Sequence, residues 1–400
     1  MSVLIVTYNP EEDSFRACLR SILNQTYRSL EVVVVDNGSR GPVLERAIAQ
    51  EHSGLESPPP IRLTRLPHNR GFAHGMNRAI AECNGPLCLL LNPDTQLEPT
   101  AIAILAEAAS DHADAIGFAP KVRLAAYPEI LDSLGLEFSS SGDAAQRGLG
   151  QPDLGQFDRC ETIPGISMGA ALVRREAFAS DAVGLLDEQF FMFFEDVDWS
   201  VRACLYGYRF LTVPAAVIFH VGSESVRKRP FTWRYRLVER NVYYMAIKNF
   251  DSRHLARFML RRTSNHLRKV ARGRRPLTTI RLLAESWIAL WTLHAERQVV
   301  QTRRRQRDSV LADAEPGPLA VDPLRWAPIY TWATLRNSLG RLYAVTGEER
   351  WARAYRYLEL VTDLDIRFGG GEILTRLERL ASPLPEAVRV YASKVLQNSL

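Results

Sequence analysis

The chain has 400 residues, of which 46% are hydrophobic and 24% charged, a composition typical of a folded globular protein and not of a disordered one. Its length exceeds one ordinary domain and predicts two or three. No apolar run approaches the roughly 20 residues that span a bilayer, and the first ten residues lack the length and the basic flank of a signal peptide. We therefore expect a cytoplasmic protein.

The net charge of +5 is unevenly distributed. Residues 226–310 contain 22 Lys and Arg against 5 Asp and Glu, a local charge of +17, which leaves about −12 for the rest of the chain. Such a block predicts either a solvated helical surface or a polyanionic partner. The five cysteines are scattered without a CxxC pair, which argues against zinc and against a disulfide framework and predicts reduced thiols.

The first predicted elements alternate between strand and helix. Residues 2–7 and 31–36 are β-branched runs typical of buried parallel strands. The segment between them starts with Pro10 and acidic residues and then places its apolar residues on one helical face, which predicts a βαβ unit. The same alternation continues with a helix at 42–52, a strand at 61–67, a helix within 69–85 and a strand at 86–94. The first 120 residues therefore predict a doubly wound α/β domain, whose ligands bind at the carboxyl ends of the strands.

The middle of the chain, about 120–225, predicts three short strands and a helix that ends at Gly207. The strands are at 169–175, 209–214 and 216–221, and the helix is DVDWSVRACLYG at 196–207. Beyond 225, long helical patterns are dense in Arg and Trp. A linker at 313–323 divides them from further helical patterns, which begin at 324.

Polar residues follow four of the predicted strands or open the next helix. They are Thr7-Tyr8-Asn9, Asp36-Asn37-Gly38-Ser39, Asn69-Arg70-Gly71 before the helix with Asn77, and Asn92-Pro93-Asp94. Each alone is an ordinary turn sequence. All four in one domain predict a ligand crevice, in which Asp36 can accept hydrogen bonds from a ribose or a base.

The chain contains neither GxGxxG after its first strand nor GxxxxGK[ST] anywhere, which argues against a dinucleotide oxidoreductase and a P-loop NTPase. Phosphates would then need another neutralising group. A divalent cation held by a carboxylate such as Asp94 supplies one.

The sequence FFMFFEDVDW places Glu195, Asp196 and Asp198 directly after four Phe and one Met. Apolar surroundings raise the pKa of a carboxyl group, and a general base needs a pKa near the working pH. One of the acids is also expected to cap the helix near Val197. His220 ends a later strand and is open to two interpretations, a structural histidine or a metal ligand.

Six motifs in this order resemble glycosyltransferase family 2, and within it the bacterial rhamnosyltransferases that build cell-wall linkers and O-antigens. They are VTYN at 6–9, VVDNGS at 34–39, NRGFAHGMN at 69–77, LLLNPD at 89–94, FFMFFEDVDW at 190–199 and HVGSES at 220–225. The resemblance covers about residues 1–245. It implies a GT-A-type nucleotide-diphospho-sugar transferase fold, doubly wound with a mostly parallel sheet and followed by a C-terminal helical extension.

The resemblance also implies roles for single residues. Asp196 would be the catalytic base, and Glu195 would orient it or the acceptor. Asp94 would bind Mg²⁺ or Mn²⁺ with help from His220, although Asn92 at the first position of the family's DxD-type motif removes one ionic ligand. The nucleotide-sugar would contact Thr7, Asn9, Asp36, Asn37, Asn69, Gly71, Asn77, Asn92 and Asp94. The acceptor side would be formed by Ser167, Met168, Gly169, Asp198 and Trp199.

The predicted function is inverting, metal-dependent transfer of a sugar from a nucleotide-diphosphate donor, dTDP-rhamnose among the candidates, to a hydroxyl of a lipid-linked or polysaccharide acceptor in cell-envelope glycan synthesis. Two alternatives stay open: a catalytically idle relative that binds an anionic surface, and a sugar nucleotidyltransferase. The expected domains are a catalytic domain at 1–225, with a nucleotide-binding half at 1–120 and an acceptor half at 121–225, a basic helical region at 226–312 and a helical tail at 324–400.

The basic region interleaves its clusters at 227–229, 268–275 and 303–307 with tryptophans. We expect it to contact the anionic inner face of the cell membrane as a peripheral protein, with a solvated surface as the alternative and nucleic acid disfavoured. The tail is expected to pack on the core or to mediate homo-oligomer formation.

Overall fold

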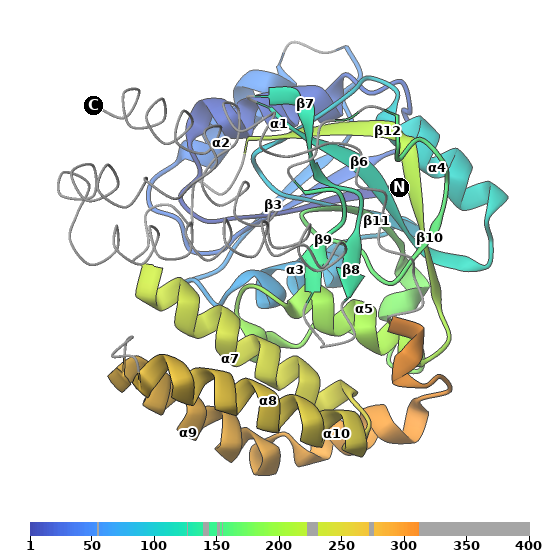
Figure 1. The fold of residues 1–400 in the computed structure, drawn as a ribbon. Helices are drawn as coiled ribbons and strands as arrows, with labels where there is room; N and C mark the ends of the chain where they lie inside the picture. The colour runs from blue at the N-terminus through green and yellow to red at the C-terminus, as the bar shows by residue number, and fades with distance from the viewer. Residues whose placement is uncertain are drawn as a thin grey trace, which may run out of the picture.

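A computed structural model describes residues 1–53, 56–125, 127–138, 144–149, 153, 155–221, 231–271 and 276–311. Figure 1 shows a central sheet with helices on both faces and a separate group of helices beyond one of these faces. The predicted linker at 313–323 and the predicted tail at 324–400 lie outside the described residues.

The first half of the sheet is parallel, as predicted from the alternating pattern. Its strands are β1 (Ser2–Thr7), β2 (Glu31–Asp36), β3 (Ile61–Arg65) and β4 (Leu87–Leu91), and its helices are α1 (Glu12–Leu23), α2 (Val43–His52) and α3 (Phe72–Glu82). β1 lies between β2 and β4, and β3 pairs with the outer side of β2.

Side chains along β1 alternate between two hydrophobic cores. Leu4 and Val6 belong to the core that contains α3, whereas Val3 and Ile5 belong to the core that contains α1 and α2. This is the period-two pattern of a strand with helices on both faces. Burying each such side chain stabilises the fold by about 1.5–3 kcal/mol, so both faces of the sheet are required.

The second half of the sheet is mixed. It contains β5 (Thr95–Leu97), β6 (Ala115–Leu124), β7 (Tyr127–Ser133), β10 (Thr162–Ile163), β11 (Ala170–Arg174) and β12 (Arg209–His220), with helix α4 (Ala101–Asp111). The main strand order is β10-β12-β6-β11-β4-β1-β2-β3, in which β11 and β10 run against the other strands. β8 (Leu136–Phe138) and β9 (Ala144–Gln146) form a separate two-stranded sheet. The doubly wound, mostly parallel sheet is thus present.

Two details differ from the sequence-based expectation. The strands expected at 209–214 and 216–221 are the single strand β12, whose pairing with β6 shifts register between Val213 and Val217, around Pro214. A proline lacks the N–H that a strand ladder needs, so it marks a local irregularity and not the end of the strand. Helix α5 (Glu195–Leu205) follows the short helices η1 (Arg175–Phe178) and η2 (Glu188–Phe190) and starts two residues before Val197.

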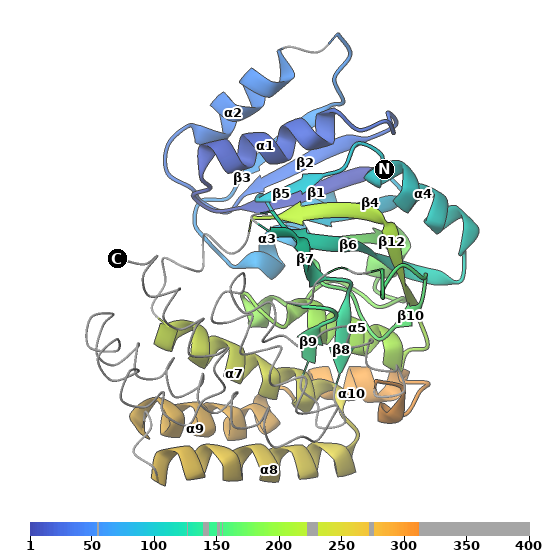
Figure 2. The ribbon, with the colours of Figure 1, turned by 45° about the horizontal axis from the view of Figure 1, so that its top comes forward.

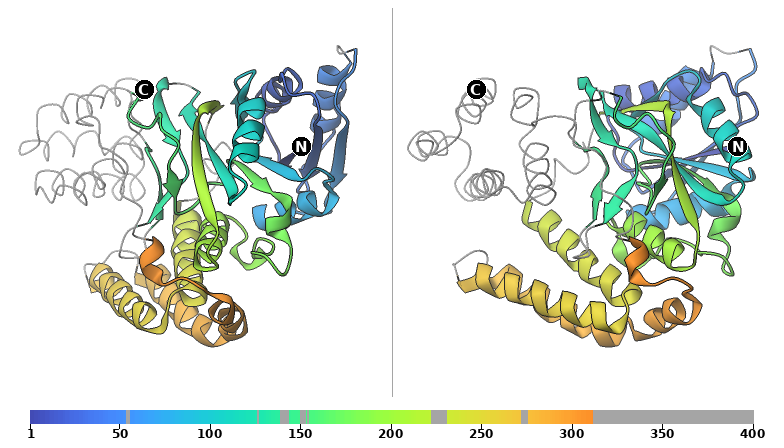
Figure 3. Two further views of the ribbon diagram at one scale, coloured as in Figure 1. Left: turned by 90° about the vertical axis from the view of Figure 1, so that its right-hand side faces the viewer. Right: turned by 45° about the vertical axis from the view of Figure 1, so that its right-hand side comes forward.

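The predicted helical extension is present as a group of four helices, α7 (Phe231–Asn249), α8 (Ser252–Ala271), α9 (Pro276–Thr292) and α10 (His294–Arg303), followed by η3 (Asp308–Leu311). In Figures 2 and 3 these helices lie beyond α5, and α8 and α9 are farthest from the sheet. None of the helices in the described ranges is both long and apolar enough to cross a membrane.

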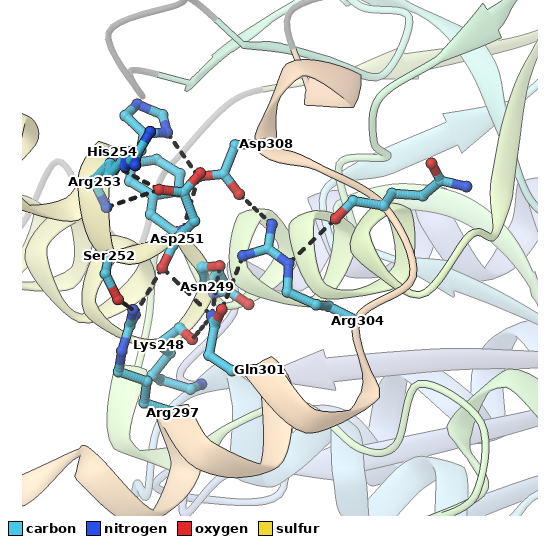
Figure 4. Close-up of polar contacts among 12 residues, drawn as sticks. Lys248, Asn249, Asp251, Ser252, Arg253, His254, Arg297, Gln301, Arg304 and Asp308 are labelled. Carbon is cyan, nitrogen blue, oxygen red and sulfur yellow. Dashed lines mark hydrogen bonds and ion pairs between the residues drawn. The ribbon is translucent and has the colours of Figure 1, made fainter.

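Polar side chains of α10 hold the end of α7 in place (Figure 4). Arg297 Nη1 donates to Ile247 O at 2.6 Å and to Phe250 O at 2.7 Å, and Gln301 Nε2 donates to Asn249 O at 3.0 Å. The last carbonyls of a helix have no partners within it, so these bonds satisfy groups that would otherwise need water. Asp251 then caps α8 by accepting from the backbone N–H of Arg253.

Candidate active site

The pairing of β5 with β12 brings together residues that are far apart in the sequence. His220 lies opposite Thr95 in this ladder, and Val221 N donates to Asp94 O at 3.0 Å. The other edge of β12 pairs with β6, and β6 pairs in turn with β7, which carries Asp132. The carboxylates of Asp94 and Asp132 therefore flank the His220 ring.

The distances define a small polar cluster at the end of β12. His220 Nε2 lies 3.4 Å from Asp94 Oδ1 and 3.4 Å from Asn92 Nδ2, and His220 Nδ1 lies 2.9 Å from Asp132 Oδ2. Gly169 leaves room for Asn92, because a Cβ at Gly169 would lie 2.9 Å from Asn92 Nδ2. The sequence-predicted residues Asn92, Asp94, Gly169 and His220 are thus brought together.

The two carboxylates of this cluster favour a positive charge on the His220 ring between them. Burial opposes protonation of His220, but its bonds to Asp132 and Asp94 outweigh burial and raise its pKa to about 10. The imidazolium of His220 is therefore the positive partner of two carboxylates. A metal ion binds only the neutral ring, so a bound cation would replace this proton.

The donor set fits a divalent cation that also binds a ligand. Among the described residues, no group of three or more His, Cys, Asp or Glu side chains is arranged to hold a metal ion by itself. Mg²⁺ is commonly bound by one or two carboxylates together with substrate phosphates and water, so the pair of Asp94 Oδ1 and His220 Nε2 suffices as the protein's share. Asp132 would be the outer partner of His220, because metal-binding histidines usually donate their second N–H to a carboxylate.

A second acidic centre lies at the start of α5. Asp196 is partly exposed, and its Oδ1 accepts from Val197 N at 2.8 Å while its Oδ2 accepts from Met168 N at 3.4 Å. Ser167 also hydrogen-bonds Asp196. The segment of Ser167 and Met168, predicted for the acceptor side, is therefore in contact with the predicted base.

Burial raises the pKa of Asp196 above its ordinary value, although the surrounding N–H donors oppose this. Burial and the Asp196 charge raise the pKa of Glu195 as well, and Glu195 Oε2 is buried without a hydrogen-bond partner. Because a second negative charge beside the first is unfavourable, Glu195 and Asp196 resist being deprotonated at the same time. This is a suitable environment for a general base near neutral pH.

The expectation that one of the acids caps α5 is wrong. The N-cap is Phe194, which has φ 69° and makes no side-chain capping bond. The backbone before α5 is strained, because Phe191, Phe193 and Phe194 all have positive φ, a conformation that costs a non-glycine residue about 1 kcal/mol or more. Such strain persists only where neighbouring groups hold it.

Asn241 of α7 holds this loop, and its neighbour Arg240 also donates to the carbonyls of Gln189 and Phe190. Its side chain is fully buried, and its Nδ2 donates to Phe190 O at 2.9 Å, Met192 O at 2.9 Å and Phe193 O at 2.6 Å. The loop that precedes the acid pair is thus positioned by a helix outside the predicted catalytic domain.

The predicted nucleoside contacts lie at the ends of β1 and β2. Thr7 Oγ1 is buried without a hydrogen-bond partner, as a group that awaits a ligand would be. Asp36 Oδ1 accepts from Ser39 N at 2.8 Å, and Asp36 Oδ2 lies 3.1 Å from Arg65 Nη1. Asn9 has φ 46°, and its side chain accepts from Arg40 N at 2.9 Å.

The asparagines predicted to line the same pocket hold loops together in the structure. Asn37 Nδ2 donates to Gly71 O at 2.8 Å, and Asn69 Oδ1 accepts from Gly71 N at 2.9 Å. Asn77 is buried and donates to Leu186 O at 2.8 Å. Gly71 has φ 92°, and a Cβ there would lie 2.3 Å from Phe191 O, so the donor-side loop touches the strained loop.

Asp198 and Trp199, predicted for the acceptor side, are fully buried. Asp198 accepts from Lys248 Nζ at 3.0 Å and from Asn249 Nδ2 at 2.7 Å, and Trp199 Nε1 donates to Gly184 O at 2.7 Å. These contacts join α5 to α7 and to the preceding loop. Both residues could influence an acceptor only through the position of α5.

Sequence reasoning missed Asp132 and Asn241. Asp132 lies in a strand with no recognisable motif, and only the pairing of β7 with β6 reveals it. Asn241 could have been found, because Asn241, Lys248 and Asn249 recur at helical spacing on one side of α7.

The fold is that of a glycosyltransferase of GT-A type. The structure of GalNAc-T7 with UDP, GalNAc and Mn²⁺ matches the chain with a TM-score of 0.51 at 17% identity, over 63% of this chain and 48% of that one. Residues 2–180 match the family described as "Glycosyl transferase family 2".

Two curated relatives are also similar in sequence. The N-acetylglucosaminyl-diphospho-decaprenol L-rhamnosyltransferase of Mycobacterium tuberculosis is 28% identical over 259 residues, which are 58% of this chain and 78% of that protein. An N-acetylglucosaminyltransferase of Sinorhizobium fredii is 34% identical over 107 residues, 26% of this chain and 25% of that protein.

Proposed function

We propose that the chain is an inverting, metal-dependent glycosyltransferase that moves a sugar, with L-rhamnose as the leading candidate, from a nucleotide-diphosphate donor to a hydroxyl of a lipid-linked acceptor in cell-envelope glycan synthesis. The observation that carries the proposal is the separation of two acidic centres with different partners. Asp94 lies beside His220, whereas Asp196 lies beside Glu195 and the backbone of Met168.

On the donor side, Thr7 and Asp36 would bind the nucleoside, and Asp94 with His220 would hold the divalent cation. A bound Mg²⁺ or Mn²⁺ supplies positive charge that stabilises the departing diphosphate. Asp132 would keep the His220 ring oriented through Nδ1.

On the acceptor side, Asp196 would accept the proton of the attacking hydroxyl. The N–H groups of Val197 and Met168 fix its carboxylate, so the proton acceptor is held in one orientation. One displacement without a covalent intermediate inverts the anomeric centre. A retaining glycosidase would instead need a second carboxylate as nucleophile beside the same bond.

The choice of sugar and acceptor rests on the mycobacterial relative, whose name describes L-rhamnose transfer to a lipid-linked diphosphate acceptor. The metal rests on the Asp94 and His220 pair and on the Mn²⁺ in the GalNAc-T7 structure.

The test is a panel of nucleotide sugars, assayed by release of nucleoside diphosphate with a polyprenyl-diphospho-sugar acceptor, with and without Mg²⁺ or Mn²⁺. We expect release that requires acceptor and metal and is fastest with dTDP-rhamnose. Faster release from another donor would replace the sugar and leave the reaction class intact. Release of pyrophosphate in a reaction of a sugar phosphate with a nucleoside triphosphate would instead identify a nucleotidyltransferase.

A further inference from the structure

One side of α9 presents apolar side chains to solvent along its whole length. Leu277 and Trp291 are each 84% exposed, and every exposed apolar position has another one three or four residues away. They are Leu277, Ile280, Ala284, Trp287, Ile288 and Trp291. This spacing places them on one face of the helix, which we call the α9 stripe.

The α9 stripe is not the packing face of the helix. Leu282, Leu283 and Ala289 are buried on the opposite side, where α9 packs on α7 and α8. A helix that is apolar on both sides is typical of a buried position. In Figures 2 and 3, however, α9 lies at the end of the molecule away from the sheet. A continuous exposed apolar patch of this kind marks an interaction surface.

The neighbouring helix is strongly basic. α8 contains six Arg and Lys and no Asp or Glu. Arg253, Arg257 and Arg268 are exposed, and Trp287 Nε1 donates to Thr263 Oγ1 at 3.3 Å, which fixes the α9 stripe beside α8. An apolar stripe with exposed Trp beside a basic helix is the combination that binds the interface of an anionic bilayer.

Part of the basic cluster at 303–307 is used within the protein. Arg303 attaches α10 to the preceding domain by donating to the carbonyls of Ser180 and Asp181. Arg304 donates to Gln301 and pairs with Asp308. Arg305 and Arg307 are exposed. The cluster at 227–229 and residues 272–275 lie outside the described part of the chain.

We propose that the α9 stripe and the basic side of α8 form a docking surface for an anionic lipid bilayer, on which the chain lies as a peripheral protein. The partner is identified by charge complementarity. A second copy of the chain docked through the same face would bring two basic helices together and make them repel, whereas anionic headgroups would neutralise them. Nucleic acid would leave the apolar stripe without a partner.

Flotation of the full-length protein with vesicles tests this proposal. We expect it to float with vesicles that contain phosphatidylglycerol and not with phosphatidylcholine alone, and to float less at high salt. The double variant Leu277→Glu, Trp291→Glu should lower binding to anionic vesicles at least about tenfold, because two large side chains no longer enter the interface. Both positions are 84% exposed, so the variant should fold.

Leu185→Glu is the matched control, since Leu185 is an exposed apolar residue outside the helical group, and it should bind as the wild type does. Light scattering of the same samples gives the oligomeric state. Failure of the wild type to float, or equal flotation of the double variant, would overturn the proposal. A change from dimer to monomer in the double variant without loss of flotation would assign the α9 stripe to a second copy. Flotation needs no turnover, so its outcome is independent of the proposed reaction.

Discussion

Asp196 is the residue on which the proposed chemistry depends most. The residue is partly exposed, and Oδ1 of an asparagine can still accept the shorter bond from Val197 N, so the variant loses only the 3.4 Å contact with Met168 N. We expect Asp196→Asn to lower kcat by about 10²- to 10⁴-fold, the usual contribution of a general base. Nucleotide affinity, measured by calorimetry, should stay within a few-fold of wild type. The control is Asp181→Asn, an exposed acid of the same domain, and full activity of the Asp196 variant would remove this residue from the base role.

The raised pKa of Asp196 has a consequence for the pH dependence of transfer. A base works only when it is deprotonated, so kcat should fall as the pH drops through the pKa of Asp196. Because burial raises this pKa, the acid limb of the profile should lie at a higher pH than for an ordinary aspartate. Rates measured across acidic and neutral pH, with stability checked at each pH, would show it. An acid limb at the ordinary aspartate value would contradict the assignment.

Asp132 should act on the metal through His220 and not through the substrate. The Asp132→Asn variant keeps the shape of the side chain and removes its charge, so His220 is oriented less firmly. We expect the affinity for Mn²⁺, measured by electron paramagnetic resonance with nucleotide present, to fall about 10- to 100-fold. Asp114→Asn is the control, because Asp114 is an exposed acid paired with Arg209. Unchanged Mn²⁺ affinity in the Asp132 variant would exclude the positioning role.

At the scale of elements, helix α7 holds the strained loop before α5 in its conformation. In Asn241→Ala, the carbonyls of Met192 and Phe193 lose the donor that Asn241 supplies, and each buried group left unsatisfied costs about 1–3 kcal/mol. Phe190 O keeps Met192 N and Arg240 Nη2 as donors. The positive φ angles of the loop should then relax.

For Asn241→Ala we expect kcat to fall at least about tenfold, while KM for the donor changes little, because donor contacts lie at other strand ends. Asn265→Ala, on the exposed side of α8, should behave as wild type. If the Asn241 variant loses stability but keeps its kcat, the residue has a structural role only.

The elements up to β4 could be predicted from the sequence, because buried parallel strands and amphipathic helices leave strong local patterns. The strands β5 and β6 and helix α4 were not predicted. β1 to β4 all lie where β-branched or leucine runs predicted them. The pairing of β5 with β12 could not be predicted, since it joins residues about 120 positions apart and leaves no local signal. His220 therefore stayed open between two interpretations until the register placed it beside Asp94.

Whole-molecule stability should depend on the contact between α5 and α7. Lys248 is buried between Asp187 and Asp198, at 2.7 Å and 3.0 Å. Replacing it with an apolar residue would remove the nearest cation from the buried carboxylate of Asp198 and from the partly exposed carboxylate of Asp187, and Asp198 would keep the longer contact of 3.8 Å with Arg202. We expect Lys248→Met to lower the free energy of unfolding by about 3–5 kcal/mol in urea titrations at neutral pH. Arg281→Met, at an exposed ion pair, should change it by less than about 1 kcal/mol.

The pH dependence of this loss follows from Asp187. Burial alone would raise its pKa, but Lys248 lowers the pKa below the ordinary value. The stabilisation is therefore present above the pKa of the unfolded chain and is lost as the pH falls through the lower pKa of the folded state. The difference between wild type and Lys248→Met should shrink in acid, and a difference that grows in acid would contradict this account.

Because the strained loop depends on Asn241, only certain segments of this protein can be exchanged with those of its relatives. The family segment ends at residue 180, before the acid pair, and a chimera joined there would combine a foreign base loop with a helix that was not selected to hold it. A junction after α5 would separate Glu195 and Asp196 from their support as well. Exchange of acceptor specificity should therefore succeed only when the loop at 190–194, α5 and α7 are transplanted together.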